Sequence, residues 1–163
     1  MENLVISPYS PEDRAAVIEG SIDLQETECK LSEFCLPGRE VGERYLDHLL
    51  ELNELGSGEL LVAKIEGRVV GFIGCRVELD ASITTSDDLN MHGYISDAWT
   101  HPEFRNRGVF KALSSAAEEF LGRLPGIKVV KLNVLAKNTP AIIAYGKAGY
   151  RIQELTYIKR IKP

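Results

Sequence analysis

Residues 93–124 restrict the possible folds of this chain more than any other stretch. GYISDAWT (93–100) is rich in β-forming residues, PEFRNRG (102–108) is a basic turn, and the apolar residues of 109–124 recur at helical spacing. After Pro125-Gly126, which stops the helix, residues 127–135 (IKVVKLNVL) form a β-branched run. This order predicts a strand–helix–strand crossover, and such a connection places its two strands in one sheet.

The rest of the chain also mixes the two kinds of element, which predicts one mixed α/β fold. Ser10-Pro11 is typical of a helix start, Glu66-Gly67 of a hairpin turn, and Asn138 of a helix cap. We expect further strands at 3–10, 59–65, 68–79, 150–155 and 156–161. We expect helices at 11–24, at 41–55 and from the Asn138 cap through Lys147. Residues 25–38 should form a loop or short helix, and residues 80–92 a polar loop.

Composition limits the class of protein. The chain has 163 residues, which fits a single domain over 1–163, and no apolar run approaches the roughly 20 residues of a membrane span. The first residues lack the pattern of a signal peptide. The three cysteines are odd in number without a CxxC motif, and the three histidines have no metal-ligand spacing. We therefore expect a cytoplasmic protein with reduced thiols, no metal and no membrane contact.

The charge is unevenly distributed along the chain. Residues 1–90 contain 19 acidic and 7 basic residues, a net charge of −12, whereas residues 91–163 contain 5 and 12, a net charge of +7. The basic half includes the turn at 102–108, which favours an anionic ligand there. Nucleic acid is not an expected partner, because the chain is acidic overall and its basic residues are not interleaved with aromatic residues.

The turn itself has the chemistry of an anion site. The first N–H groups of a helix have no intrahelical acceptor and carry a partial positive charge, so they can bind phosphate. Gly108 lets a ligand approach the backbone closely, and Arg105 and Arg107 can add charge-assisted hydrogen bonds. The alternative is an ordinary connection with solvated arginines. Neither standard phosphate motif, GxxxxGK[ST] or GxGxxG, is present.

Two segments together resemble the GNAT superfamily of acyl-CoA-dependent N-acyltransferases. The first is PEFRNRGVFKAL (102–113), in which Arg105, Gly108, Phe110 and Leu113 occupy the motif positions. The second is NTPAIIAYGKAGY (138–150), in which the matching residues are Asn138, Ala141, Tyr145, Lys147, Gly149 and Tyr150. The resemblance implies a GNAT-like α/β fold, with a central, mixed and mostly antiparallel sheet, flanking helices and a splayed fourth strand.

The resemblance also implies acetyl-CoA as co-substrate and assigns residues to it. Backbone amides of Arg105, Asn106, Arg107, Gly108, Val109 and Phe110 would hold the pyrophosphate, the backbone of Ala98, Trp99 and Thr100 would pair with pantetheine, and Asn138 would hydrogen-bond it. Tyr145 would be the general acid for the leaving thiolate. The family has a small residue where this chain has Phe110. We expect its ring to point into the core beside Leu113; the alternative is a ring that obstructs the cofactor.

The general base is less sharply defined by the sequence. Asp97 lies on the predicted fourth strand, close to where the acyl group would sit, and could accept the proton of the amine or hold a cationic amine. A purely structural aspartate is the alternative. Glu78 and Asp80 are reserve candidates for the base, and His92 and His101 are weaker ones. A strand N–H near Trp99 or Thr100 could polarise the acyl carbonyl.

These assignments predict an N-acetyltransferase that transfers acetyl from acetyl-CoA to a primary amine of a small molecule or peptide by direct attack. The acidic N-terminal half favours cationic acceptors such as polyamines, aminoglycoside-like compounds, amino acids or peptide N-termini. Two other readings stay open. One is a non-catalytic acyl-CoA-binding sensor or interaction module, and the other is a homodimeric interaction protein whose turn binds another phosphate. A homodimer through the terminal strands is also plausible for an enzyme of this family.

Overall fold

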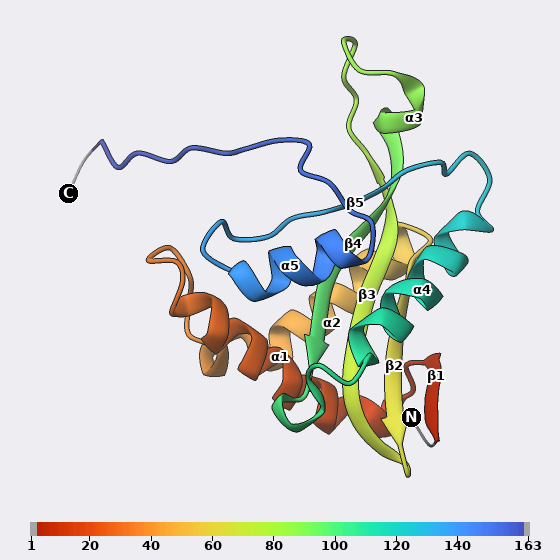
Figure 1. Ribbon diagram of the computed structural model, residues 1–163, viewed down its shortest axis with the longest axis vertical. Coiled ribbons are helices and arrows are strands. Elements are labelled where there is room, and N and C mark those ends of the chain that lie inside the picture. The colour runs from red at the N-terminus through yellow and green to blue at the C-terminus, as the bar shows by residue number, and fades with distance from the viewer. Residues whose placement is uncertain (1–2, 162–163) are drawn as a thin grey trace.

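The computed structural model describes residues 3–161 as a sheet with helices on both faces (Figure 1). The strands are β1 (Leu4–Pro8), β2 (Glu59–Ile65), β3 (Arg68–Leu79), β4 (Met91–Thr100) and β5 (Val130–Leu132). The α-helices are α1 (Arg14–Cys29), α2 (Gly38–Leu55), α3 (Asp87–Asn90), α4 (Val109–Gly122) and α5 (Thr139–Lys147), and short 3-10 turns cover Pro11–Asp13 and Pro102–Phe104.

The strands lie in the order β1-β2-β3-β4-β5. The first four pair antiparallel and β5 pairs parallel to β4, so α4 is the predicted crossover helix. Alternate side chains of β2 face opposite layers: Leu60 and Val62 pack with α1 and α2, whereas Leu61 and Ala63 pack with α4. No helix within residues 3–161 is long and apolar enough to cross a membrane.

Strand β4 contains a β-bulge at Ser96. Cys75 of β3 pairs with Ile95 and the adjacent Gly74 pairs with Asp97, so Ser96 has no partner residue. Gly74 makes room for the bulge, because a Cβ atom there would lie 2.8 Å from Ser96 Oγ. As a result Ile95 packs in the α4 layer, while Asp97 contacts α2.

Strands β4 and β5 stay together over only three residue pairs. Gly93–Ile95 pair with Val130–Leu132, and β4 then continues to Thr100 while the chain after β5 leads away to α5 (Figure 1). The backbone edge of residues 96–100 is therefore without a strand partner on the β5 side, within the described chain. The splayed fourth strand predicted from the family resemblance is confirmed.

Helices α1 and α2 approach each other closely through two glycines. A Cβ atom at Gly38 would lie 2.5 Å from the carbonyl oxygen of Ile22, and one at Gly42 would lie 2.5 Å from the Ile22 side chain. Both glycines are on the first turns of α2, so the start of α2 is fixed against the middle of α1. This contact determines where the connection between the two helices lies.

The structure corrects several predicted bounds. Residues 25–38, predicted to form a loop or short helix, instead contain the end of α1, which continues to Cys29, a turned connection, and the first residue of α2, Gly38. The short helix α3 lies in the predicted loop at 80–92, and β5 is shorter than the predicted 127–135.

The two predicted terminal strands, 150–155 and 156–161, are wrong. Residues 151–161 form no strand, and their apolar side chains are mostly exposed, as for Tyr157 at 91%. Strand-forming residues favour a sheet when they cover a buried face, and this segment covers none. Near its end Arg160 contacts the α1–α2 connection, by an ion pair to Glu33 (3.2 Å) and by stacking on Phe34.

Gly38→Ala is expected to lower the free energy of unfolding by about 1–3 kcal/mol, because the added methyl group meets a main-chain oxygen that no rotamer change can move. Urea denaturation would measure this change. Gly122→Ala is the matched control, since a Cβ atom there has no neighbour within 4 Å. Equal stability of the two variants would contradict the close contact of α1 and α2.

Candidate functional site

The turn before α4 presents a run of free backbone N–H groups. Asn106 (φ 60°) and Gly108 (φ 80°) both adopt left-handed backbone conformations, and Gly108 precedes the first helical residue. Within the described chain, the N–H groups of residues 106–111 donate no hydrogen bond to the protein. Six adjacent donors at the positive end of a helix can hold an anion such as a pyrophosphate.

The two arginines of this turn are less available than the sequence suggested. The amide of Arg105 donates to the Pro102 carbonyl, and its guanidinium donates to the Thr100 carbonyl (3.1 Å) and to Asp23 of α1 (3.3 Å). Arg107 is exposed and lies over the ring of Phe104. The predicted cradle therefore begins at residue 106, and its donors are backbone groups.

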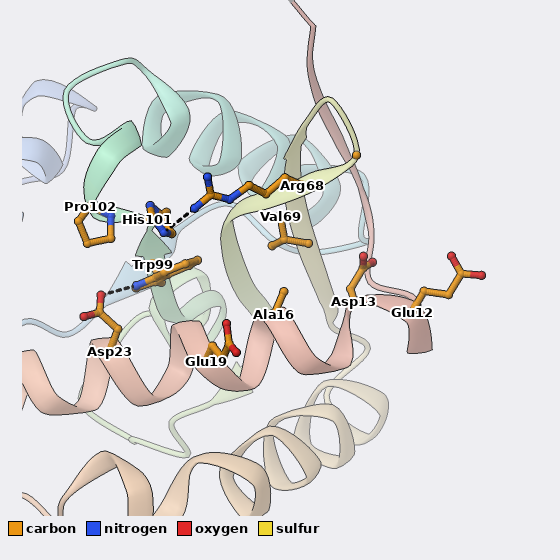
Figure 2. A pocket seen from close by; sticks show the side chains of 11 residues that line it. Glu12, Asp13, Ala16, Glu19, Asp23, Arg68, Val69, Trp99, His101 and Pro102 are labelled. Atoms are coloured by element: carbon orange, nitrogen blue, oxygen red, sulfur yellow. Dashed lines mark hydrogen bonds between the residues drawn. The ribbon is translucent and has the colours of Figure 1, made fainter.

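Trp99 places its side chain on the α1 side of the sheet. Its indole N–H donates to Asp23 (2.8 Å), and its ring stacks on Phe72, at one wall of a pocket of about 550 Å³ between α1 and the β2–β3 turn (Figure 2). His101, in the same pocket, is hydrogen-bonded to Arg68 (2.9 Å). Only the backbone of Trp99 thus remains for the pantetheine contact expected at residues 98–100.

Helix α5 begins with the predicted cap. Asn138 Oδ1 accepts the amide N–H of Ala141 at 3.2 Å, which fixes the side chain at the start of the helix. In the described residues Asn138 Nδ2 has no acceptor. This amide donor is free to bind a ligand, as the resemblance implied.

Phe110 differs from its expected place. Leu113 is fully buried in the core with Val109, but the ring of Phe110 is only half-buried and contacts Tyr145 of α5, with ring centroids 5.4 Å apart. The fully buried stripe of α4 follows the spacing 109, 113, 117 and 121, so Phe110 lies at the edge of this stripe and not in the core. The contact holds Tyr145 beside the first turn of α4.

Asp97 is a buried carboxylate on β4, with 9% of its surface exposed. Its Oδ1 accepts the Tyr45 hydroxyl at 2.7 Å, and its Oδ2 is buried with no hydrogen-bond partner in the described chain. Burial raises the pKa of Asp97, although the Tyr45 hydroxyl opposes the rise. A buried carboxylate oxygen without a donor is suited to bind or deprotonate an amine.

Tyr145 lies among acidic groups. Burial raises its pKa to about 12, and the charges of Glu28 and Asp97 and the neighbouring Tyr94 add to the rise. The tyrosine is therefore protonated at neutral pH. Its hydroxyl has no hydrogen-bond partner within residues 3–161, so it can donate to a ligand.

Sequence reasoning missed Glu28 and Tyr45. Burial and the charge of Asp97 raise the pKa of Glu28, which places this carboxyl within electrostatic reach of Asp97. Glu28 was missed because the predicted helix ended near residue 24, and Tyr45 because its helical spacing indicated only a packing role. The 3.6-residue period continued through 28 would have been the available signal for Glu28.

The reserve candidates for the base are occupied elsewhere. Glu78 pairs with Arg76, and Asp80 pairs with Lys131, which lowers the pKa of Asp80. The ring of His92 is buried against the Leu89 carbonyl (2.9 Å). No group of three or more potential ligand side chains in the described residues is arranged to hold a metal.

The fold is the same as that of a solved structure, and a family model matches most of the chain. The solved structure of a putative acetyl transferase from Pyrococcus furiosus superposes with a TM-score of 0.73 at 24% identity, covering 98% of this chain and 100% of that one. Residues 26–150 match the Acetyltransferase (GNAT) family, and the chain belongs to that family. The resemblance drawn from the two sequence segments is confirmed.

Two relatives carry related descriptions. An uncharacterized N-acetyltransferase of Methanocaldococcus jannaschii is 30% identical over 122 residues, which are 72% of this chain and 50% of that protein. The N-alpha-acetyltransferase of Sulfurisphaera tokodaii is 27% identical over 123 residues, 75% of this chain and 71% of that protein. The match thus spans half the length of the first relative.

Tyr45→Phe is expected to lower the free energy of unfolding by about 1–3 kcal/mol at neutral pH, because Asp97 loses a donor while it stays buried. Loss of the hydroxyl raises the pKa of Asp97 further, so the folded variant takes up a proton there more readily as the pH falls. The stability difference between variant and wild type should therefore become smaller in acid. Denaturant titrations from neutral to mildly acidic pH measure both effects.

A double-mutant cycle supplies the control for this prediction. In an Asp97→Asn background, Tyr45→Phe should have a smaller effect on stability that no longer varies with pH. An effect of unchanged size and pH dependence in that background would show that Tyr45 does not act through Asp97.

Proposed function

We propose that this protein transfers the acetyl group of acetyl-CoA to a primary amine by direct attack, without a covalent enzyme intermediate. The observation that carries the proposal is the run of free N–H groups at 106–111, at the end of the open backbone edge of β4. A pyrophosphate fits such donors, and Gly108 leaves no Cβ atom in their way. Membership of the acetyltransferase family supports the choice of acetyl-CoA.

The proposed cofactor path follows from the same residues. Amides of 106–110 hold the pyrophosphate, the backbone of Ala98, Trp99 and Thr100 pairs with pantetheine in the gap left by β5, and Asn138 Nδ2 donates to it. When bound, acetyl-CoA supplies the acetyl group as a thioester. Phe110 lies against Tyr145 rather than in the core, so its ring forms a wall of this path.

Asp97 and Tyr145 divide the proton transfers between them. Asp97 Oδ2, buried and without a donor, accepts a proton from the incoming ammonium, which leaves the amine neutral for attack. Tyr145, protonated because its pKa is raised, donates to the sulfur of the leaving thiolate. The Tyr45 hydroxyl keeps Asp97 oriented, so it is a positioning residue.

The proposed acceptor is a cationic primary amine of a small molecule or peptide. Glu28 and Asp97 give the site two carboxyl groups, which attract an ammonium and repel a free carboxylate. The description of the Sulfurisphaera relative as an N-alpha-acetyltransferase supports a peptide N-terminus as one such acceptor. Glu28 reaches the site from α1, in the acidic half of the chain.

Calorimetric titration is expected to show acetyl-CoA binding in the micromolar range, on the order of 1–100 μM, with weak binding of ATP. Gly108→Glu should abolish binding, because the new side chain is strained at φ 80° and places a carboxylate among the phosphate donors. Gly122→Glu, at the far end of the same helix, should bind normally. No acetyl-CoA binding by the natural protein would contradict the proposal.

Tyr145→Phe should lower kcat by about 100-fold or more, the usual effect of losing a general acid, with acetyl-CoA affinity unchanged. Asp97→Asn should lower kcat similarly. It should also remove the decline in activity that we expect of the wild type as falling pH protonates Asp97. The acceptor screen would use polyamines, aminoglycosides, amino acids and peptides.

Tyr150→Phe is the control for Tyr145→Phe, because the Tyr150 hydroxyl donates to Glu118 (2.8 Å) and takes no part in the proposed transfer. Its kcat should match that of the wild type. Acetyl-CoA binding without transfer to any amine, and without an effect of Tyr145→Phe, would favour the non-catalytic acyl-CoA-binding module instead.

A further inference from the structure

Two free cysteines flank the connection between α1 and α2. Cys29 is the last residue of α1, and Cys35 lies three residues before α2 begins at Gly38. Both side chains are half-buried, whereas the third cysteine, Cys75, is fully buried in the sheet. The proposed acetyl transfer uses none of the three.

The two thiols share one small hydrogen-bond network. Cys29 Sγ donates to the Leu36 carbonyl (3.0 Å), and Gln25 Nε2 donates both to that carbonyl (2.9 Å) and to Cys35 Sγ (3.1 Å). Cys35 Sγ also lies 3.9 Å from the Gln25 carbonyl. Gln25 and Leu36 together therefore contact both sulfurs: Gln25 contacts Cys35 Sγ, and Leu36 accepts from Cys29 Sγ.

The surroundings distinguish the two sulfurs chemically. Burial raises the pKa of Cys35 to about 11, and the adjacent Cys29 thiol and the charge of Glu28 add to the rise, while Gln25 opposes it. Cys35 is thus a poor nucleophile at neutral pH, because the thiolate is the reactive form. The first attack on an oxidant is therefore not assigned to Cys35.

We propose that Cys29 and Cys35 are a redox-active pair that forms a reversible intramolecular disulfide and closes residues 29–35 into a ring. The connection is tied down on both sides: Gly38 N–H donates to Glu26 (2.8 Å), and Gly38 packs on Ile22. Both cysteines thus lie in a connection whose ends are held against each other. The inference does not depend on the proposed acetyl transfer.

The oxidant in this step is a low-molecular-weight disulfide. The Cys29 thiolate attacks one of its sulfurs, the S–S bond breaks, and one thiolate leaves, which creates a mixed disulfide on Cys29. Cys35 then loses its proton to solvent and attacks Cys29 Sγ, and the second small thiolate leaves. The two protein thiols are oxidised by two electrons, and the small disulfide is reduced to two thiols.

The ring would fix the surface that the C-terminal segment contacts. Glu33 and Phe34, between the two cysteines, form the ion pair and the stacking contact with Arg160. Glu28 precedes the ring directly and lies within electrostatic reach of Asp97. Oxidation would therefore reduce the freedom of the connection beside the acidic groups of the site.

The test is equilibration of the full chain with reduced and oxidised glutathione, followed by alkylation of free thiols and intact mass measurement. The expected product lacks two hydrogens and two alkylatable thiols, and peptide mapping should place the new bond between Cys29 and Cys35. Cys75, buried with its thiol donating to the Glu59 carbonyl (3.6 Å), should be alkylated only after denaturation.

Cys35→Ser is the informative variant. Without its partner, Cys29 should retain the glutathione adduct, while the wild type should hold less than about a tenth as much, because a tethered thiol acts at a local concentration of millimolar or more. Cys29→Ser should form far less adduct than Cys35→Ser, since the remaining Cys35 is mostly protonated. Dithiothreitol should restore both thiols of the wild type.

Three outcomes would overturn the inference. They are a persistent glutathione adduct on Cys29 in the wild type, a bond to Cys75, and a disulfide between two chains. Slower amide exchange over residues 30–37 in the oxidised protein would be the expected sign of the closed ring. Absence of acetyl-CoA binding in both the reduced and the oxidised protein, with the Cys29–Cys35 bond formed, would contradict the proposed function and leave this inference intact.

Discussion

The bulge at Ser96 is the feature on which the rest of the site depends. One extra residue in β4 shifts the register, so that Asp97 contacts Tyr45 of α2 while Ile95 stays in the core under α4. The same part of the strand is where β5 ceases to pair with β4. A single irregularity thus coincides with an open backbone edge and a buried carboxylate, and Gly74 is the residue that makes room for it.

Burial of Asp97 lowers the stability of the fold but raises the affinity of this carboxylate for a proton. An ionised carboxylate is disfavoured in a buried position, and here Tyr45, Ser96 and the nearby charge of Arg76 oppose the rise in the pKa of Asp97 without cancelling it. Its second oxygen is buried with no hydrogen-bond partner in the described chain, which costs stability. Burial and the same acidic groups also raise the pKa of Tyr145. Tyr145 therefore keeps its proton at neutral pH, as a general acid must.

The sequence was sufficient where local chemistry decides the structure. The turn at 102–108 and the Asn138 cap follow from short-range rules of helix ends, and both are present. The runs of β-forming residues were enough to predict the first four strands. It failed for the terminal segment, because residues 150–161 have strand-forming side chains but no buried face to cover.

The sequence by itself determined the family, the crossover around α4 and the identity of Asp97, Tyr145 and Asn138 as candidate residues. Only the tertiary structure decided that Phe110 contacts Tyr145, that Arg105 is engaged by Asp23, and that Glu28 and Tyr45 approach Asp97. The physical reason is range. Caps, turns and periodicity depend on residues a few positions apart, whereas these contacts join residues tens of positions apart, which meet only after the sheet and helices have packed.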